Sequence, residues 1–116
     1  MPVRLRTAAQ LDAAFAADRF LVFKHSTRCP ISAGAFEEYS RWSEAHPEIA
    51  TAWIDVIQER PLSQEVAVRT GIRHESPQAI LLAHGEHRWN ASHGAITRAS
   101  LSTAGSRIPA PVPPTG

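Results

Sequence analysis

The only cysteine of the chain, Cys29, lies in the stretch H-S-T-R-C-P-I-S, residues 25–32. If a helix begins directly after it, Cys29 is the N-cap and Pro30 takes the first helical position, where the N–H that proline lacks would have no partner. The N–H groups of Ile31 and Ser32, with the positive end of the helix dipole, then stabilise a thiolate. Because the thiolate is the nucleophilic form of cysteine, this spacing predicts a reactive residue.

The neighbours of Cys29 are expected to support this reactivity. Arg28, His25 and Lys24 bring possible positive charge, and the Ser32 hydroxyl can turn toward the sulfur. The opposing interpretation is a small, buried and inert cysteine, which is the commonest role of a free thiol. The polar turn Ser-Thr-Arg-Cys-Pro between an apolar run and a helical pattern favours the reactive interpretation.

Composition restricts the class of protein. The chain has 116 residues, of which 43% are apolar and 20% charged, so one soluble domain with a single core is expected. A net charge of +1 without a Lys/Arg block argues against nucleic-acid binding. We expect no membrane association, because no apolar run reaches the roughly 20 residues of a membrane helix and no signal-peptide core is present. A single cysteine cannot form an internal disulfide, which predicts a cytoplasmic location.

Hydrophobic spacing predicts alternating helices and strands. We expect strands over 20–23, 50–56, 78–83 and 87–91. A first helix is expected over about 8–17, after a capping box, and a second from Cys29 to about 46. A third is expected from an N-cap at Ser63 to a stop at Gly71, and a last one from about Thr97. Prolines from Pro109 onward oppose regular structure, so residues 1–104 are predicted to form the domain and residues 105–116 a disordered, proline-rich tail.

This order of elements predicts an α/β fold. Strands separated by helices pair in parallel, and the closing hairpin adds antiparallel neighbours, which gives a central mixed β-sheet flanked by helices. Ser76-Pro77 stands directly before the most apolar strand. On the residues alone this proline can be a simple trans strand-entry residue, since only about 5–6% of such bonds are cis.

A strand, a C-P-x-S helix start and an x-Pro before a hairpin together resemble the thioredoxin fold. More closely, T-R-C-P-I-S at 27–32 and H-E-S-P-Q at 74–78 resemble the monothiol bacilliredoxin family, thioredoxin-like proteins of the bacillithiol redox system. The resemblance covers roughly residues 5–104 and leaves out the proline-rich tail. One departure is Arg28, where the family usually has threonine.

The resemblance implies a cis bond at Pro77, with the Ser76 backbone facing Cys29 and pairing with an incoming disulfide. It also implies a set of site residues: catalytic Cys29, Pro30 and Ser32, and substrate-binding Arg28, Ile31, Ser76 and Pro77.

The position that carries the second cysteine of a C-x-x-C enzyme holds Ser32. Cys29 can therefore attack a mixed disulfide and accept the small thiol, but another thiol must then release it. With the resemblance, this predicts a monomeric monothiol thiol–disulfide oxidoreductase that removes bacillithiol, or a similar small thiol, from cytoplasmic proteins. Bacillithiol is the expected co-substrate, and no bound cofactor is expected.

Three alternatives remain open. A monothiol glutaredoxin-like protein could carry an iron–sulfur cluster between two copies, but such proteins have C-G-F-S, and Pro30 stiffens the loop. A thioredoxin-like module that only binds partners would have an unreactive Cys29. His84, His87 and His93 could suggest a metal site, but they lack ligand spacing and acidic partners, so we expect no metal.

Overall fold

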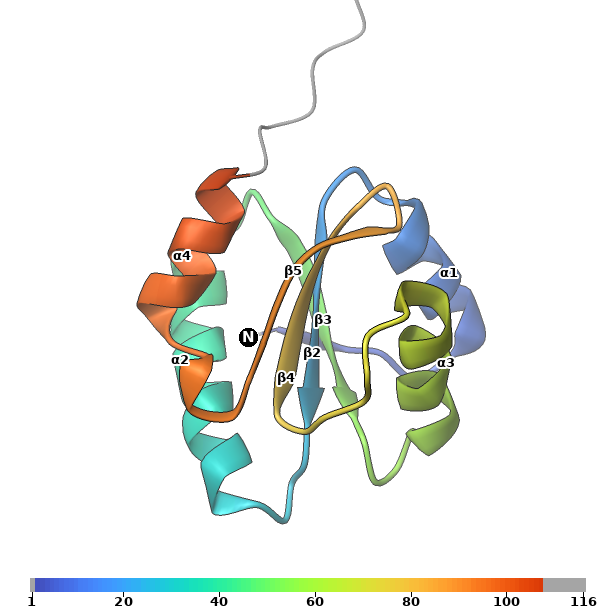
Figure 1. Ribbon diagram of the computed structural model, residues 1–116, viewed down its shortest axis with the longest axis horizontal. Coiled ribbons are helices and arrows are strands. Elements are labelled where there is room, and N and C mark those ends of the chain that lie inside the picture. Colours follow the sequence, from blue (N-terminus) through green and yellow to red (C-terminus); the bar gives the residue numbers. More distant parts are fainter. Residues whose placement is uncertain (1, 108–116) are drawn as a thin grey trace, which may run out of the picture.

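The computed structural model describes residues 2–107. Its elements follow one another along the chain as shown in Figure 1. They are β1 (Val3–Arg4), α1 (Ala8–Ala16), β2 (Phe20–His25), α2 (Pro30–Ala45), β3 (Ala50–Asp55), α3 (Arg60–Thr70), β4 (Gln78–Ala83), β5 (Glu86–Ser92), a 3-10 turn (His93–Ala95) and α4 (Arg98–Arg107). The predicted α/β class is confirmed. The short strand β1 was not predicted, because two residues are too few for a recognisable pattern.

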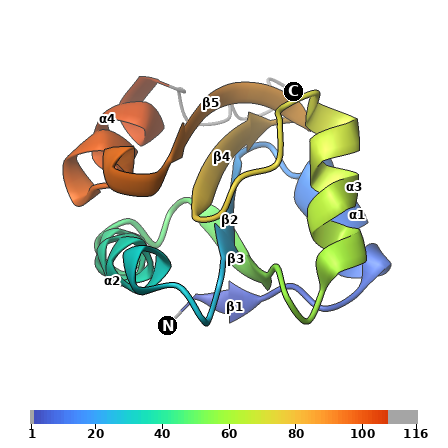
Figure 2. The same ribbon diagram turned by 60° about the horizontal axis from the view of Figure 1, so that its bottom comes forward.

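The strands form one mixed sheet in the order β1-β3-β2-β4-β5. Strand β3 pairs in parallel with β1 and β2, whereas β4 pairs antiparallel with β2 and β5. Helices α2 and α4 cover one face, and α1 and α3 cover the other (Figure 2). The predicted mixed sheet with helices on both faces is therefore present.

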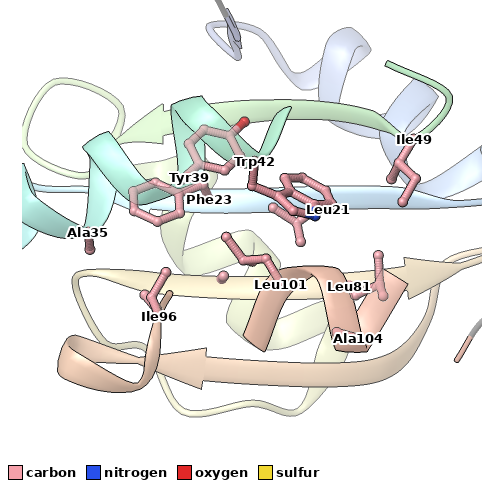
Figure 3. Close-up of a cluster of buried hydrophobic side chains, with 11 residues drawn as sticks. Leu21, Phe23, Ala35, Tyr39, Trp42, Ile49, Leu81, Ile96, Leu101 and Ala104 are labelled. Carbon is pink, nitrogen blue, oxygen red and sulfur yellow. The ribbon is translucent and has the colours of Figure 1, made fainter. Parts of the chain in front are cut away.

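Alternating side chains of the central strands divide the core in two. Leu21 and Phe23 of β2 face α2 and α4, where Tyr39 stacks on Phe23 with ring centroids 4.5 Å apart (Figure 3). Val22 faces the opposite way, toward α1 and α3. Both faces of β2 are buried, as its continuous apolar run predicted. The strand that leads to Cys29 is thus held from both sides.

Helix α3 begins earlier than expected. It starts at Arg60 with Pro61 in its first turn, so Ser63 is a buried residue inside the helix and not its cap. Proline is well suited to a helix start, and this signal was stronger than the serine. Gly71 ends the helix as predicted, because its φ of 72° is in the left-handed region that glycine adopts readily.

The last helix continues beyond the expected domain boundary. Helix α4 runs to Arg107, so the prediction that regular structure stops before residue 105 is wrong for residues 105–107. Gly105 allows a close approach here, since a Cβ on it would lie 2.9 Å from Ile49 Cδ1. The remaining predicted tail, 108–116, lies outside the described residues. Within residues 2–107 no helix is long and apolar enough to cross a membrane.

We predict that Gly85→Ala destabilises the fold. Gly85 has a φ of 78°, and an added Cβ would lie 2.8 Å from the Phe15 carbonyl oxygen. The left-handed conformation alone costs a residue with a Cβ about 1–2 kcal/mol. Urea unfolding should show at least this loss in the free energy of unfolding. Gly94→Ala is the matched control, because its Cβ would meet nothing within 4 Å. Equal stabilities of the two variants would contradict the prediction.

Candidate active site

Cys29 lies where strand β2 turns into helix α2. It is the N-cap of α2, in an extended conformation, and Pro30 follows in the first turn. The Cys29 N–H donates to the Ser26 carbonyl at 3.3 Å, and its own carbonyl accepts from Ala33 N–H at 3.0 Å. The thiol is partly exposed and makes no hydrogen bond to the first turn. This backbone geometry holds a free, reachable sulfur at a helix start.

Ser32 lies below this turn and is fully buried. Its Oγ accepts a hydrogen bond from Ser26 N–H at 2.9 Å and lies 2.8 Å from His25 Nδ1. The hydroxyl therefore joins the end of the strand, the turn and the helix. It points into the protein, whereas the sequence suggested that it could turn toward the sulfur. Ser32 shapes the loop that presents Cys29.

His25 is packed among aromatic rings beneath the turn. Its ring stacks on Phe36 at 4.4 Å between centroids and meets the edge of Trp53 at 5.5 Å. Burial lowers the pKa of His25 below 6.5, and the charge of Asp55 only partly opposes this. The imidazole is consequently neutral at pH 7. It does not supply the positive charge that the sequence suggested for Cys29.

The Ser76–Pro77 peptide bond is cis. It directly precedes the pair formed by Lys24 of β2 and Gln78 of β4, so it lies beside the end of β2 from which the Cys29 turn departs. Among residues 2–107 the buried Ser76 hydroxyl has no hydrogen-bond partner, and no backbone hydrogen bond joins Ser76 to another residue. The loop before β4 thus offers unpaired polar groups at this edge of the sheet.

The remaining predicted substrate-binding residues frame the sulfur. Arg28 is exposed directly before Cys29, and Ile31, directly after Pro30, is 60% exposed. An exposed cation and an exposed apolar side chain thus lie on either side of the Cys29–Pro30 dipeptide. Both are available to contact a partner.

A second polar group lies on the opposite face of the sheet and was not predicted as a unit. Lys24 is fully buried, and its Nζ lies 3.1 Å from His74 Nδ1, which also lies 3.3 Å from Ser63 Oγ. Burial lowers the pKa of Lys24 to about 8. Since Lys24 and His25 are adjacent in a strand, they face opposite ways, and Lys24 faces away from α2. The signal in the sequence was a lysine inside an otherwise apolar strand.

The histidines near the closing hairpin are separated in space. His87 bonds to Asn90 at 2.8 Å, and His84 lies 3.4 Å from Asp18. His93 lies 4.0 Å from Glu75. Within the part of the chain that the structure describes, no three histidine, cysteine or acidic side chains are grouped as metal ligands.

The fold and the cysteine turn define a thioredoxin-like protein. A structure described as that of a proposed oxidoreductase with a thioredoxin fold is 34% identical, covers 90% of this chain and 93% of its own, and superposes with a TM-score of 0.84. A thioredoxin variant from Halobacterium salinarum is 21% identical, with coverages of 97% and 94% and a TM-score of 0.76. Mitochondrial thioredoxin 3 of Saccharomyces cerevisiae in its oxidised form is 13% identical, with coverages of 92% and 95% and a TM-score of 0.74.

The two distant structures support the fold alone, but the sequence comparison goes further. The family described as monothiol bacilliredoxin BrxC matches residues 3–101, and the chain belongs to this family. The predicted family and thioredoxin-like fold are thereby confirmed. Family and fold together support thiol–disulfide oxidoreductase chemistry.

We predict that Ser32→Ala lowers stability. The change leaves the Ser26 N–H and the His25 ring nitrogen without their shared partner beneath the turn. An unsatisfied buried polar group costs about 1–3 kcal/mol, and denaturant unfolding should show a loss of that size. Ser43→Ala is the control, because the Ser43 hydroxyl bonds only to the Ser40 carbonyl of its own helix. A loss no larger than that of the control would show that the Ser32 bonds do not stabilise the turn.

We also predict that stability falls on mild acidification. The folded protein holds the pKa of His25 below the 6.5 of an ordinary histidine, so the unfolded chain binds the proton more readily. The contribution of His25 to stability is then complete above about pH 6.5 and is lost as the pH falls through that value toward the folded pKa. His74 shifts in the same direction, so His25→Asn should reduce the pH slope without removing it.

The slope is measured as urea midpoints between about pH 7 and about pH 5, the window in which the folded and unfolded chains differ in protonation of His25. An unchanged slope in His25→Asn would contradict the assignment to His25.

Proposed function

We propose that the protein removes bacillithiol, or a similar small thiol, from mixed disulfides on cytoplasmic proteins, with Cys29 as the nucleophile. The observation that carries the proposal is a partly exposed, lone cysteine at a helix N-cap with a buried serine in place of a second cysteine. Membership of the monothiol bacilliredoxin family supports the same chemistry. Arg28, Ile31, Ser76 and Pro77 are proposed to contact the substrate.

The reaction consists of two disulfide exchanges. In the first, the Cys29 thiolate attacks the small-thiol sulfur of the mixed disulfide, and the substrate protein leaves as a thiolate that takes up a proton. In the second, the thiolate of a free small thiol attacks the sulfur now bonded to Cys29. This releases Cys29 as a thiolate and yields a disulfide of two small thiols. No electrons are gained or lost overall, so no bound redox cofactor is required.

The buried serine explains why the second step needs an outside thiol. The Ser32 hydroxyl is occupied by Ser26 N–H and His25, and a hydroxyl cannot form a disulfide. A chain with 116 residues and one cysteine has no internal resolving thiol. The Cys29 adduct is therefore expected to persist until a small thiol arrives.

The exposed groups around Cys29 suit an extended protein substrate. Ile31 gives an apolar contact beside the sulfur, and Arg28 gives a charged one. The unpaired backbone of Ser76 can form main-chain hydrogen bonds with a substrate segment, as sheet edges do with extended peptides.

The proposal predicts transfer of the small thiol onto Cys29. A model protein blocked with bacillithiol, and in parallel one blocked with glutathione, is incubated with the unchanged protein, and both partners are weighed by mass spectrometry. The substrate should lose the mass of the small thiol, and Cys29 should gain it. Cys29→Ala should abolish the transfer, because Cys29 is the only cysteine of the sequence and the variant has no thiol.

The two substrates and the variant separate the possible outcomes. Faster transfer from the bacillithiol-blocked protein than from the glutathione-blocked one supports the named thiol. Equal rates would support a transferase without that preference. If neither substrate is unblocked and Cys29 gains no adduct, the chain is not a transferase, and a binding role replaces this proposal.

A further inference from the structure

A cavity of about 320 Å³ opens on the α3 side of the sheet. It lies between the end of β3, the first turns of α3 and the loop that leads to cis Pro77. Its lining consists of Val56, Ile57, Arg60, Ser63, Gln64 and His74.

The cavity adjoins the Cys29 turn through short connections. Val56 N–H donates to the His25 carbonyl at 3.0 Å, and the His25 ring contacts Ser32 of helix α2. His74, on another wall, stands three residues before cis Pro77. The three loops concerned lie at the same edge of the sheet, the lower edge in Figure 1. A molecule bonded to Cys29 therefore has the cavity as its neighbour on the α3 side.

One cation borders the cavity and a second lies behind its wall, both without an acidic partner among the described residues. Arg60 lines it, and Lys24 lies buried behind His74. Within residues 2–107 neither forms an ion pair with a carboxylate. The nearest acids on β3 and before α3, Asp55 and Glu59, are both engaged by Arg4 at 3.7 and 3.3 Å.

His74 adds a hydrogen-bond donor to this wall. A lysine ammonium can only donate, so the His74 Nδ1 that lies 3.1 Å from Lys24 Nζ must accept. The neutral imidazole then carries its proton on Nε2, at the far side of the ring from Lys24. Burial, then the charges of Lys24 and Arg60, lower the pKa of His74 against the opposing charge of Glu75, which keeps this ring neutral. Glu75 is itself 4.0 Å from His93.

From this arrangement we infer that the cavity binds a carboxylate of the small thiol whose sulfur is bonded to Cys29. The inference rests on the proposed function and adds a class of substrate to it: low-molecular-weight thiols that carry carboxylates, in preference to neutral ones. Arg60 offers a guanidinium that suits a carboxylate, and His74 offers its Nε2–H. Bacillithiol and glutathione both belong to this class.

The buried charge gives the physical reason. A buried ammonium without a carboxylate is costly, and here its only hydrogen-bond partner among the described side chains is a neutral ring. An anion in the cavity would supply an opposite charge directly to Arg60 and, across the His74 ring, to Lys24. Charge-assisted hydrogen bonds of this kind are stronger than neutral ones, so a carboxylate gains more from this cavity than a hydroxyl does.

The test uses two forms of a model protein. One is blocked with mercaptosuccinate, which has two carboxylates, and the other with neutral 2-mercaptoethanol. The measured quantity is the ratio of the two transfer rate constants. Arg60→Gln should lower this ratio roughly five- to tenfold, the effect of losing one charge-assisted contact, and Lys24→Met should lower it in the same direction. Arg88→Gln removes an equal charge at the opposite end of the β4–β5 hairpin and should leave the ratio unchanged.

The outcomes separate this inference from the proposed function. If transfer occurs and the ratio in Arg60→Gln and Lys24→Met equals that of Arg88→Gln, the cavity does not bind the carboxylate and the inference is wrong. If no blocked protein is unblocked at all, the proposed function fails, and direct binding decides on the cavity. For this, malate is added to Cys29→Ser protein while the His74 ring signals are followed by NMR. A saturable shift that Arg60→Gln abolishes supports an anion site, and the absence of a saturable shift overturns it.

Discussion

The hydroxyl of Ser32 is the contact on which the presentation of Cys29 depends. It accepts from Ser26 N–H and contacts the ring of His25, and so joins the end of β2, the turn and the first residues of α2. Ser32 and His25 are buried and Ser26 is half-buried. An unpaired polar group away from water is costly, so the turn has few other ways to close. Serine suits this position because its side chain is small and its oxygen can accept a hydrogen bond from Ser26 N–H while it contacts the His25 ring. The sulfur can remain partly exposed because the serine below it carries the structural bonds.

The two faces of the sheet contribute different chemistry at the same edge. Toward α2, the strand β2 ends in His25, whose neutral ring lies among Phe36 and Trp53 and supports the cysteine turn. Toward α3, the preceding residue Lys24 remains cationic at pH 7, because its pKa is lowered only to about 8. Because side chains alternate along a strand, the neutral His25 and the cationic Lys24 face opposite sides of the sheet although they are adjacent in the sequence. The Cys29 turn begins at the end of this strand.

Much of this arrangement could be predicted from the sequence, because the signals concerned were local. The C-P-x-S helix start needs only the preference of proline for the first helical turn, and the strands before it and after Pro77 are continuous apolar runs. The direction of the Ser32 hydroxyl could not be predicted, since it depends on a histidine seven residues away and on which face that histidine occupies. The contact between Lys24 and His74 spans fifty residues and arises only when β4 pairs with β2. The start of α3 was misplaced because Pro61 and Ser63 both signal helix starts and only the chain's path after β3 decides between them.

A single thiol changes what the rest of the site must do. A C-x-x-C enzyme releases its substrate by an internal attack, so it needs to recognise only the protein partner. In the proposed function, with Ser32 in the resolving position, the small thiol binds twice, first as part of the mixed disulfide and again as the free thiol that regenerates Cys29. Affinity for the small thiol then affects both exchanges, and weak recognition would leave Cys29 blocked. The cavity lined by Arg60 and His74 is proposed to supply this recognition, which a dithiol enzyme does not need.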